Sequence, residues 1–448
     1  MNDDLSRLTD RLLDAARKAG AEAAEAMAVR GTSVSVDVRN GTLEQAERAD
    51  GTEIGLRVLV GQRQATVGAS DMSDRTVAAL AERAVAMARE APEDASLGLA
   101  DAALLSPCRD GAGLDLWDDA PEPGAAALER MARAAEAAAL AVPGISQSES
   151  ASARHSRTEA HSAMTNGFAG SFARSSTVVS MTAITGEGAG MERDWAYEAR
   201  THLADLPDPA EIGRRAAERT VARKSARKPP TGAFPVLYDE RVASGLIGHL
   251  LAAVNGASVV RGASWLRDRL GGQVLPAALS LLEEPHRRRV FGSRLFDDEG
   301  LPTATRAIVR DGVLTGWTLD LGTARRLGME STANAMRGPA TAPSPGHTNI
   351  RLTPGAASRE ELIAGMGTGL LVTSMLGASI NPTTGDYSRG AAGFWVEGGA
   401  IAYPVNECTI AGNLRDILLR LTPANNGRET DGHVVPSLLA EGLTIAGK

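Results

Sequence analysis

The chain begins with apolar residues at helical spacing and then changes to strict alternation. Four leucines share one face of a helix predicted over residues 5–19: Leu5, Leu8, Leu12 and Leu13. The next segment, TSVSVDVRNGTLEQ, alternates valines with polar residues, which is typical of a half-buried strand. Its Asn40-Gly41 pair favours a two-residue hairpin turn. The pattern therefore predicts a helix followed by a β-hairpin.

The alternation of strands and helices continues through the first half of the chain. The segment EIGLRVLVGQRQATVG predicts two further strands on either side of Gly61. Two Ala-rich helices follow, over residues 73–91 and 124–141. Residues 144–203 form a second block of strands, with Asn166-Gly167 as its turn. Antiparallel hairpins combined with separate helices predict an α+β fold.

A helix predicted over residues 208–228 ends this half, because Pro229-Pro230 cannot continue it. The remainder is mostly short strands and glycine turns, after one strand, FPVLYD, and one helix, ERVASGLIGHLLAAVNG. Asp311-Gly312 and Gly398-Gly399 are predicted hairpin connectors. We expect three parts: an N-terminal α/β domain with antiparallel hairpins (1–205), a helix and linker (206–230) and a C-terminal β-rich domain (231–448).

Length, charge and cysteine content narrow the class of protein. A chain of 448 residues exceeds what one hydrophobic core usually supports, which agrees with two domains. The formal net charge of −8 gives no general attraction to nucleic acid or anionic membranes. No apolar run approaches the ~18 residues of a membrane span. Because the N-terminus lacks a secretory signal and Cys108 and Cys408 form no disulfide framework, we expect a cytoplasmic protein.

The basic segment 214–228 is the best candidate for contact with nucleic acid. It contains arginines and lysines throughout, but no aromatic side chains are interleaved with them, and Glu218 lies within the run. We interpret the segment as a solvated helix face that leads into a linker. Direct binding of nucleic acid is not expected.

The chain carries few signatures of catalysis. No HExxH motif occurs, and among the histidines only His249 lies on a convincing predicted helix. No G-x-S-x-G nucleophile elbow is present. The acidic run Asp297-Asp298-Glu299 is followed by glycine and proline, and we interpret it as a turn.

The stretch NPTTGDYSRGAAGFWVEGG, residues 381–399, is unlike ordinary core or surface. It combines several glycines with an Asp-Tyr-Ser-Arg quartet and a Phe-Trp pair. We interpret residues 382–385 as a turn across which Asp386 and Arg389 pair, followed by a hairpin with Trp395 on the face opposite its neighbours. A structural turn and the wall of a ligand cavity are both open interpretations.

Two long segments closely resemble the TldD/PmbA family, also called modulator of DNA gyrase. They are FDDEGLPTATRAIVRDGVLTGWTLDLGTARRLG and NPTTGDYSRGAAGFWVEGGAIAYPVNECTIAGNL. The early hairpin VRNGTLEQAERAD fits as well, so the resemblance covers essentially the whole chain. It implies an N-terminal α/β domain, a C-terminal β-rich domain that encloses a central cavity, and assembly as a dimer. GDYSRGAAGFWVE and GASWLRDRLGGQVLP resemble the PmbA (TldE) branch.

The branch decides the chemistry that the resemblance implies. In the TldD branch a helix carries HExxxH, and a C-terminal cysteine completes a zinc site for peptide hydrolysis. Here Leu250 follows His249, Val254 stands where the second histidine would be, and GHVVPSL near the C-terminus has no cysteine. We therefore expect no metal ligand and no cofactor in this chain, and zinc in a TldD-type partner. The two would form a heterodimer, with a homodimer possible for the isolated chain.

The resemblance implies a metalloprotease complex that degrades or processes unfolded peptides, such as antitoxins and peptide-antibiotic precursors. An extended peptide could pair as an added strand. Candidates for catalysis are His249, Asp386 and Arg389. The candidate peptide-binding wall is Gly385, Asp386, Tyr387, Ser388, Arg389 and Gly390. Two alternatives stay open: a self-sufficient peptidase homodimer, and a non-enzymatic regulator of gyrase or of toxin–antitoxin systems.

Overall fold

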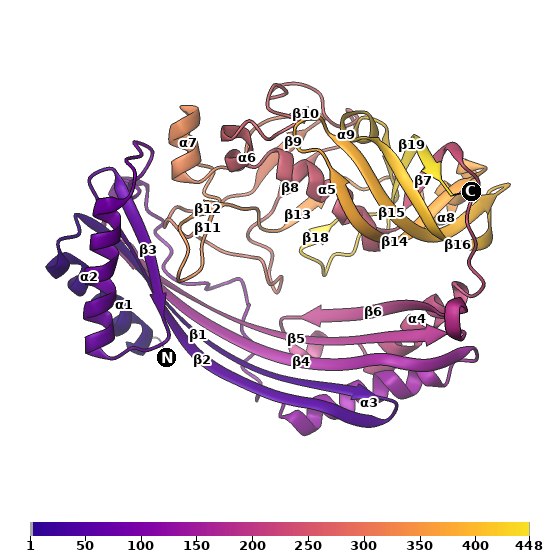
Figure 1. Ribbon diagram of the computed structural model, residues 1–448, viewed down its shortest axis with the longest axis horizontal. Coiled ribbons are helices and arrows are strands. Elements are labelled where there is room, and N and C mark those ends of the chain that lie inside the picture. The colour runs from indigo at the N-terminus through magenta and orange to yellow at the C-terminus, as the bar shows by residue number, and fades with distance from the viewer. Residues whose placement is uncertain (1–2, 448) are drawn as a thin grey trace.

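A computed structural model describes residues 3–447, and its N-terminal half is a curved antiparallel sheet with helices on one face (Figure 1). The strand order is β3-β2-β1-β4-β5-β6, and all neighbours are antiparallel. The strands are β1 (Ala23–Arg39), β2 (Thr42–Val60), β3 (Arg63–Ala69), β4 (Ile145–Met164), β5 (Ala169–Thr185) and β6 (Glu192–Arg200). The helices are α1 (Asp3–Ala19), α2 (Asp74–Glu90), α3 (Ala125–Leu140) and α4 (Pro209–Ala222).

Strand β1 shows why the helices cover a single face of this sheet. Its even-numbered side chains are buried toward both ends of the strand, because alternate residues of a strand point to the same side. Ala24, Ala26 and Ala28 pack in the core beneath α1 and α2. The valines at 34, 36 and 38 pack with α3 and α4 in a separate core. The opposite face of the sheet is turned toward the C-terminal half (Figure 1).

The C-terminal half is built on a closed β-barrel. Its sheet has the order β16-β15-β14-β7-β19-β17, and an additional β16–β19 pairing closes it. The barrel elements are β7 (Gly232–Tyr238), β14 (Gly369–Ile380), β15 (Asp386–Glu397), β16 (Ala400–Asn413), β17 (Leu421–Pro423) and β19 (Leu438–Ala446). Strands β7 and β14 run parallel to each other. The expected α+β class with a β-rich C-terminal region is confirmed.

A second, smaller sheet with the order β10-β9-β8-β13-β18 accompanies the barrel. Its strands are β8 (Leu281–Glu283), β9 (Arg306–Arg310), β10 (Val313–Leu314), β13 (Ile350–Leu352) and β18 (His433–Val434). The remaining elements are α5 (Glu240–Ala253), α6 (Gly256–Val260), α7 (Leu321–Leu327), β11 (Ala335–Met336), β12 (Ser344–Pro345), α8 (Arg359–Met366) and α9 (Leu414–Leu418). Within residues 3–447, no helix combines the length and the apolar character needed to cross a bilayer.

The predicted hairpin turns are confirmed by their backbone conformation. Asn40-Gly41 and Gly398-Gly399 both have two consecutive residues with positive φ, which matches the twist of the flanking strands. The turn before β15 likewise needs a glycine, because Gly385 has φ +83. On β15, Trp395 and Val396 enter two different apolar clusters, as the predicted alternation requires.

The interpretation of the basic segment as a solvated helix face is confirmed only in part. Helix α4 ends at Ala222, six residues earlier than predicted, and Ser225 then adopts a left-handed conformation. Arg215 and Arg223 of this segment pair with acidic residues of β6. Arg227 lies beyond the helix and stacks over Tyr403 of the barrel, 3.6 Å from the ring centre. Arg214, Lys224 and Lys228 are exposed as expected, whereas Arg215, Arg223 and Arg227 also hold neighbouring elements together.

Candidate functional site

A cleft opens between β6 of the N-terminal sheet and α5 of the C-terminal half. Its main chamber has a volume of about 390 Å³ and is lined by residues 197–201 of β6 and its end, residues 289–292 and residues 430–433. A narrower extension of about 80 Å³ reaches Trp195. Both parts share lining residues from β6, α5 and the C-terminal segment: Tyr197, Ser244, Arg428, Asp431 and His433.

An exposed aromatic pair forms one wall of the cleft. Trp195 and Tyr197 lie two positions apart on β6, so their side chains share a face, with ring centres 5.4 Å apart. They are 43% and 46% exposed. Because aromatic residues make up only 3% of the chain, such a pair in an open cleft is a strong candidate for ligand contact. Sequence reasoning missed it, although the W-x-Y spacing in a predicted strand was the available signal.

The free edge of β6 is partly occupied. β6 is the last strand of its sheet, and an exposed edge can accept an added strand. However, the carbonyl oxygens of Trp195 and Tyr197 accept hydrogen bonds from Arg219 and Arg215, and that of Ala199 accepts one from Arg200. A peptide in the cleft therefore meets side chains along this edge, not a row of free carbonyl groups.

A buried carboxylate joins the two halves at the cleft. Glu198 is 2% exposed and lies 2.6 Å from Arg215, 2.6 Å from Arg428 and 2.9 Å from Arg200. Burial opposes its ionisation, but the three guanidinium groups outweigh that effect and lower the pKa of Glu198. Since Arg428 belongs to the C-terminal half, this cluster fixes the position of the 428–433 segment against β6.

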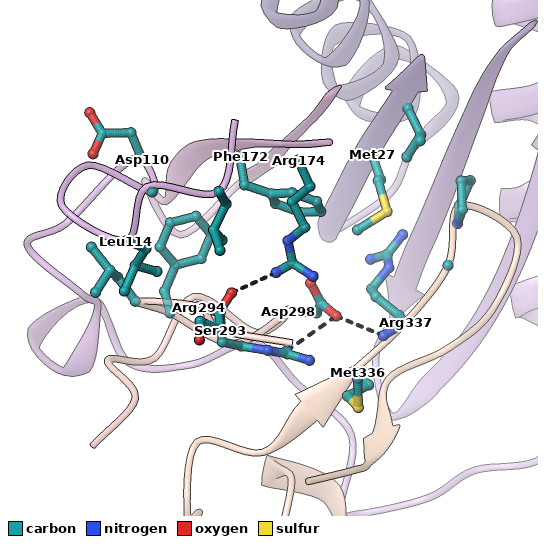
Figure 2. Close-up of a pocket in the computed structure, with 17 residues that line it drawn as sticks. Met27, Asp110, Leu114, Phe172, Arg174, Ser293, Arg294, Asp298, Met336 and Arg337 are labelled. Atoms are coloured by element: carbon teal, nitrogen blue, oxygen red, sulfur yellow. Dashed lines mark hydrogen bonds and ion pairs between the residues drawn. The ribbon is translucent and has the colours of Figure 1, made fainter. Parts of the chain in front are cut away.

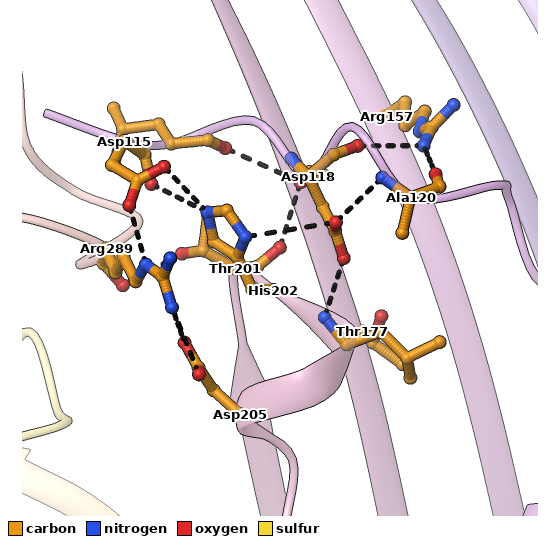
Figure 3. Close-up of polar contacts among 12 residues, drawn as sticks. Asp115, Asp118, Ala120, Arg157, Thr177, Thr201, His202, Asp205 and Arg289 are labelled. Carbon is orange, nitrogen blue, oxygen red and sulfur yellow. Dashed lines mark hydrogen bonds and ion pairs between the residues drawn. The ribbon is translucent and has the colours of Figure 1, made fainter. Parts of the chain in front are cut away.

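A polar network around His202 lies behind Arg289, a residue of the cleft lining (Figure 3). His202 Nε2 lies 3.0 Å from the carbonyl oxygen of Asp115 and 3.1 Å from its carboxylate. Arg289, which lines the cleft, pairs with Asp115 at 2.7 Å and with Asp205 at 2.8 Å. The hydrogen bond from Arg289 lowers the pKa of Asp115. We assign this network to positioning Arg289, since its charges are paired within the protein.

The structure brings three of the sequence-predicted site residues together beside α5. His249 of α5 packs edge-on against Tyr387 of β15, with ring centres 5.8 Å apart. Arg389 donates from Nε to the carbonyl oxygen of Gly377 at 2.7 Å, and its Nη1 would lie 3.9 Å from a Cβ at Gly245 of α5. We call His249, Tyr387 and Arg389 the α5–β15 cluster.

This cluster does not fit a zinc ion. Burial and the positive charge of Arg389 both lower the pKa of His249, so its imidazole is neutral, but Arg389 also repels any cation placed beside it. The His249 Nε2 atom is buried and has no hydrogen-bond partner among the described residues. Across residues 3–447, no group of three or more His, Cys, Asp or Glu side chains is arranged to hold a metal ion.

The predicted pairing of Asp386 with Arg389 is wrong. Asp386 instead accepts hydrogen bonds from Thr384 Oγ1 at 2.6 Å and from Asn413 Nδ2 at 3.1 Å, which lower its pKa. The two residues stand three positions apart on β15, and an odd separation places side chains on opposite faces of a strand. Asp386 is thereby separated from the other two catalytic candidates.

The proposed peptide-binding wall, residues 385–390, lies apart from the lining of the cleft. None of the described residues that line the chamber or its extension belongs to this stretch. In contrast, α5 contributes Ser244 and the C-terminal segment contributes His433 to the same chamber. The two segments in which the family resemblance implied metal ligands therefore meet at the cleft.

The acidic run 297–299 is a turn, as expected, but it is buried. Asp297 is 0% exposed and accepts hydrogen bonds from the backbone N–H groups of Glu299, Leu301 and Ala335. Burial raises the pKa of Asp297 to about 7 despite these bonds. Three backbone donors satisfy its oxygens, so its role is to hold the loop together.

Comparison with known proteins places the chain in a family. The models described as PmbA/TldA metallopeptidase domain 1, central domain and C-terminal domain match residues 24–88, 118–224 and 231–447. Metalloprotease PmbA of Escherichia coli O157:H7 is 36% identical over 428 residues, which is 95% of this chain and 93% of that protein.

Solved structures agree over the full length. One from Bacteroides thetaiotaomicron, described as a modulator of DNA gyrase, is similar with a TM-score of 0.92 and 26% identity, covering 100% of both chains. TldE from Thermococcus kodakarensis has the same fold, with a TM-score of 0.84 over 98% of this chain and 100% of that one, at 19% identity. The sequence matches span nearly all of both proteins, and the chain belongs to the PmbA/TldD metallopeptidase family.

Proposed function

We propose that the chain is the metal-free, TldE-type subunit of a PmbA/TldD peptidase complex that degrades or processes unfolded peptides. One observation carries the proposal. Helix α5 and the 428–433 segment meet at the cleft, yet α5 presents one buried imidazole beside Arg389 where a metal would need several anionic or neutral ligands. The catalytic zinc therefore belongs to a TldD-type partner, and the pair forms a heterodimer.

The residues of this chain bind and orient the peptide. Trp195 and Tyr197 are partly exposed and offer apolar ring faces to peptide side chains. Ser244 adds a hydroxyl, and Arg428 a charge held in place by Glu198. When zinc is bound in the partner, it lowers the pKa of a water molecule and polarises the scissile carbonyl.

The central experiment measures zinc content and peptide hydrolysis of the chain alone and after co-purification with a TldD-type partner. We expect no stoichiometric zinc and no hydrolysis alone, and hydrolysis that a chelator abolishes in the complex. Stoichiometric zinc together with chelator-sensitive cleavage by the isolated chain would overturn the proposal. It would favour the self-sufficient homodimer, which the separation of Asp386 from Arg389 argues against.

A second experiment tests the cleft. In the complex, the double variant Trp195→Ala/Tyr197→Ala removes both exposed aromatic rings, and we expect KM for an unfolded peptide to rise roughly tenfold, since such contacts contribute about 1–3 kcal/mol. Met87→Ala is the matched control, because Met87 is 48% exposed on α2, away from the cleft. Equal KM values for the two variants would remove the cleft from the proposal.

The same two preparations, the chain alone and the complex, also test the alternative role as a regulator of gyrase. The Bacteroides relative is described as a modulator of DNA gyrase, and a purely regulatory chain would bind gyrase without any turnover of peptides. We expect the opposite: chelator-sensitive turnover by the complex. Gyrase binding with no turnover by either preparation would establish the regulatory role instead.

A further inference from the structure

A second cavity, separate from the cleft, lies where the N-terminal sheet meets loops of the C-terminal half (Figure 2). Its volume is about 290 Å³, at the small end of ligand-binding pockets, which run from ~300 to 1,000 Å³. Three arginines line it: Arg174 from β5, Arg294 from the loop before β9 and Arg337 after β11. We call it the arginine pocket.

The three guanidinium groups are held rigidly but are not saturated. Arg174 donates to the carbonyl oxygen of Ser293 at 2.9 Å, Arg294 to that of Ala335 at 3.0 Å, and Arg337 to Glu25 at 2.6 Å. The Nε atoms of all three, and Nη2 of Arg337, are buried and have no hydrogen-bond partner among the described residues. The Arg337 side chain is 1% exposed, so solvent does not satisfy these donors.

The charge of the lining favours a monoanion. Three arginines line the pocket with two carboxylates, Asp298 and the exposed Asp110. Glu25, which pairs with Arg337, also pairs with Arg57, so one positive charge is left in excess. Burial and the neighbouring Arg294 lower the pKa of Arg174 to about 10, which still leaves it charged at neutral pH. A dianion such as a phosphate monoester would carry more charge than the lining balances, and Asp298 would repel it.

The rest of the wall is apolar. Met27 and Phe172 of the sheet, Leu114 and Phe296 of the loops, and Met336 surround the arginines. The chain has only six phenylalanines, and two of them stand here, so the apolar lining is not a chance feature of composition. The ligand that fits therefore joins one carboxylate to one apolar group of modest size.

The pocket also shares a wall with the cleft. The Arg174 guanidinium stacks over Phe172, 4.7 Å from its ring centre, and lies 5.6 Å from the ring centre of Phe291. Phe291 lines the cleft, whereas Phe172 lines the pocket. The two cavities therefore lie on either side of Arg174 and these two rings.

We propose that the arginine pocket binds the C-terminal carboxylate of a peptide whose last residue has an apolar side chain. The carboxylate accepts hydrogen bonds from the guanidinium groups of Arg174, Arg294 and Arg337, which line the pocket, and the last side chain packs against Met27 and Phe172. This rests on the proposed peptide-processing function and specifies it: one end of the substrate or product is fixed in this chain while the rest lies in the cleft.

The test is direct binding to the purified chain, without a partner, measured by calorimetry. The probes are an N-acetylated hexapeptide that ends in leucine with a free carboxylate, its C-terminal amide, and inorganic phosphate. We expect the acid to bind at least ~10-fold more tightly than the amide, and phosphate more weakly than the acid. Equal affinity for acid and amide, or tighter binding of phosphate, would overturn the proposal.

Variants assign the binding to the pocket. Arg174→Gln should abolish the preference for the acid, whereas Arg109→Gln, which removes an arginine stacked on Phe168 outside the pocket, should leave it unchanged. Met336→Glu is a second variant at a lining position that is 39% exposed and so tolerates a charge. It cancels the excess positive charge and should also remove the preference. An acid preference that survives both variants would place the carboxylate elsewhere.

The binding assay tests the pocket, and the hydrolysis assay tests the peptidase proposal. If acid and amide bind alike but the complex still cleaves peptides, the pocket assignment fails and the peptidase proposal stands. If the acid is preferred but no partner restores cleavage, the pocket stands and the peptidase proposal fails. The same hexapeptide pair serves as substrate in the complex, so both results come from one set of reagents.

Discussion

The α5–β15 cluster and the arginine pocket both leave buried nitrogen atoms without a partner among the described residues, but in opposite electrostatic settings. In the cluster, the His249 imidazole is neutral and faces the positive charge of Arg389. In the pocket, Arg174 and Arg337 line a small cavity with one positive charge in excess, and each has a buried donor without a partner among the described residues. The first arrangement repels a metal cation, whereas the second attracts an anion.

The comparison shows that the type of residue matters less than the charges around it. A histidine on a helix can contribute to a zinc site, but the positive charge of Arg389 makes the surroundings of His249 unfavourable for a cation. Arginines usually pair with carboxylates, yet here Glu25 satisfies only one of the two Nη atoms of Arg337. Three variants, each with a control, test this contrast.

The largest expected effect comes from the carboxylate that anchors the pocket. Glu25 pairs with Arg337 at 2.6 Å and with Arg57 at 2.9 Å, and all three side chains are at most 4% exposed. Glu25→Gln leaves two buried guanidinium groups without their counter-charge, which costs about 3–5 kcal/mol of the free energy of unfolding. Urea denaturation followed by circular dichroism measures it.

A surface pair provides the control for that measurement. Glu149 pairs with Arg193 at 2.6 Å, but the two side chains are 37% and 68% exposed. Glu149→Gln should therefore change the free energy of unfolding by less than about 1 kcal/mol. If both glutamine variants lost the same small amount, the Glu25 cluster would not be the anchor of the pocket.

The residues of the cluster were singled out from sequence, whereas their meeting in space and the pocket were not. His249 stood out on a periodic helix, and Tyr387 and Arg389 lay in one conspicuous stretch. What could not be foreseen was the face of each side chain: the turn allowed an Asp386–Arg389 pair, and only the strand register separates them. The pocket joins residues 27, 174, 294 and 337, which are far apart in the chain and form no motif.

The same distinction holds for the fold. Periodicity located helices α1–α5 and the Asn40-Gly41 hairpin because both depend on neighbouring residues, but it did not predict the shorter helices α6–α9. The early end of α4 depends on tertiary contacts, since Arg223 pairs with Glu192 of β6 and Arg227 lies against Tyr403 of the barrel. Closure of the barrel through the β16–β19 pairing likewise has no local signal.

A smaller effect is expected where the loop that carries Arg337 meets the N-terminal sheet. A Cβ at Gly55 of β2 would lie 1.6 Å from the carbonyl oxygen of Pro339, so Gly55→Ala forces this loop to move. Overpacking of this kind costs about 1–3 kcal/mol and should also weaken binding of the acid hexapeptide. Thermal unfolding and calorimetry measure the two effects.

Gly51 supplies the matched control on the same strand. A Cβ at this position would meet no described atom within 4 Å, and its φ is not positive. Gly51→Ala should therefore stay within about 0.5 kcal/mol of the parent and bind the acid normally. Identical behaviour of the two alanine variants would mean that the loop does not need its close contact with β2.

The smallest expected effect is on how the free energy of unfolding depends on pH. In the unfolded chain the pKa of His249 is ~6.5, and burial lowers this pKa in the folded protein. Above both values the imidazole is neutral in both states and contributes nothing. As pH falls below ~6.5 only the unfolded chain takes up the proton, so stability decreases by up to about 1.4 kcal/mol per pH unit. His249→Phe should remove that part of the decrease between pH 7 and 5.

His161→Phe is the informative counterpart, because burial lowers the pKa of His161 as well, but its Nδ1 is hydrogen-bonded to Thr9 Oγ1 at 2.8 Å. Both variants should flatten the acid side of the stability curve, measured by urea denaturation from pH 5 to 8. Only His161→Phe should also lose about 1 kcal/mol at pH 8, where a real hydrogen bond is broken. A similar loss in His249→Phe would mean that His249 has a polar partner, and the contrast with the arginine pocket would disappear.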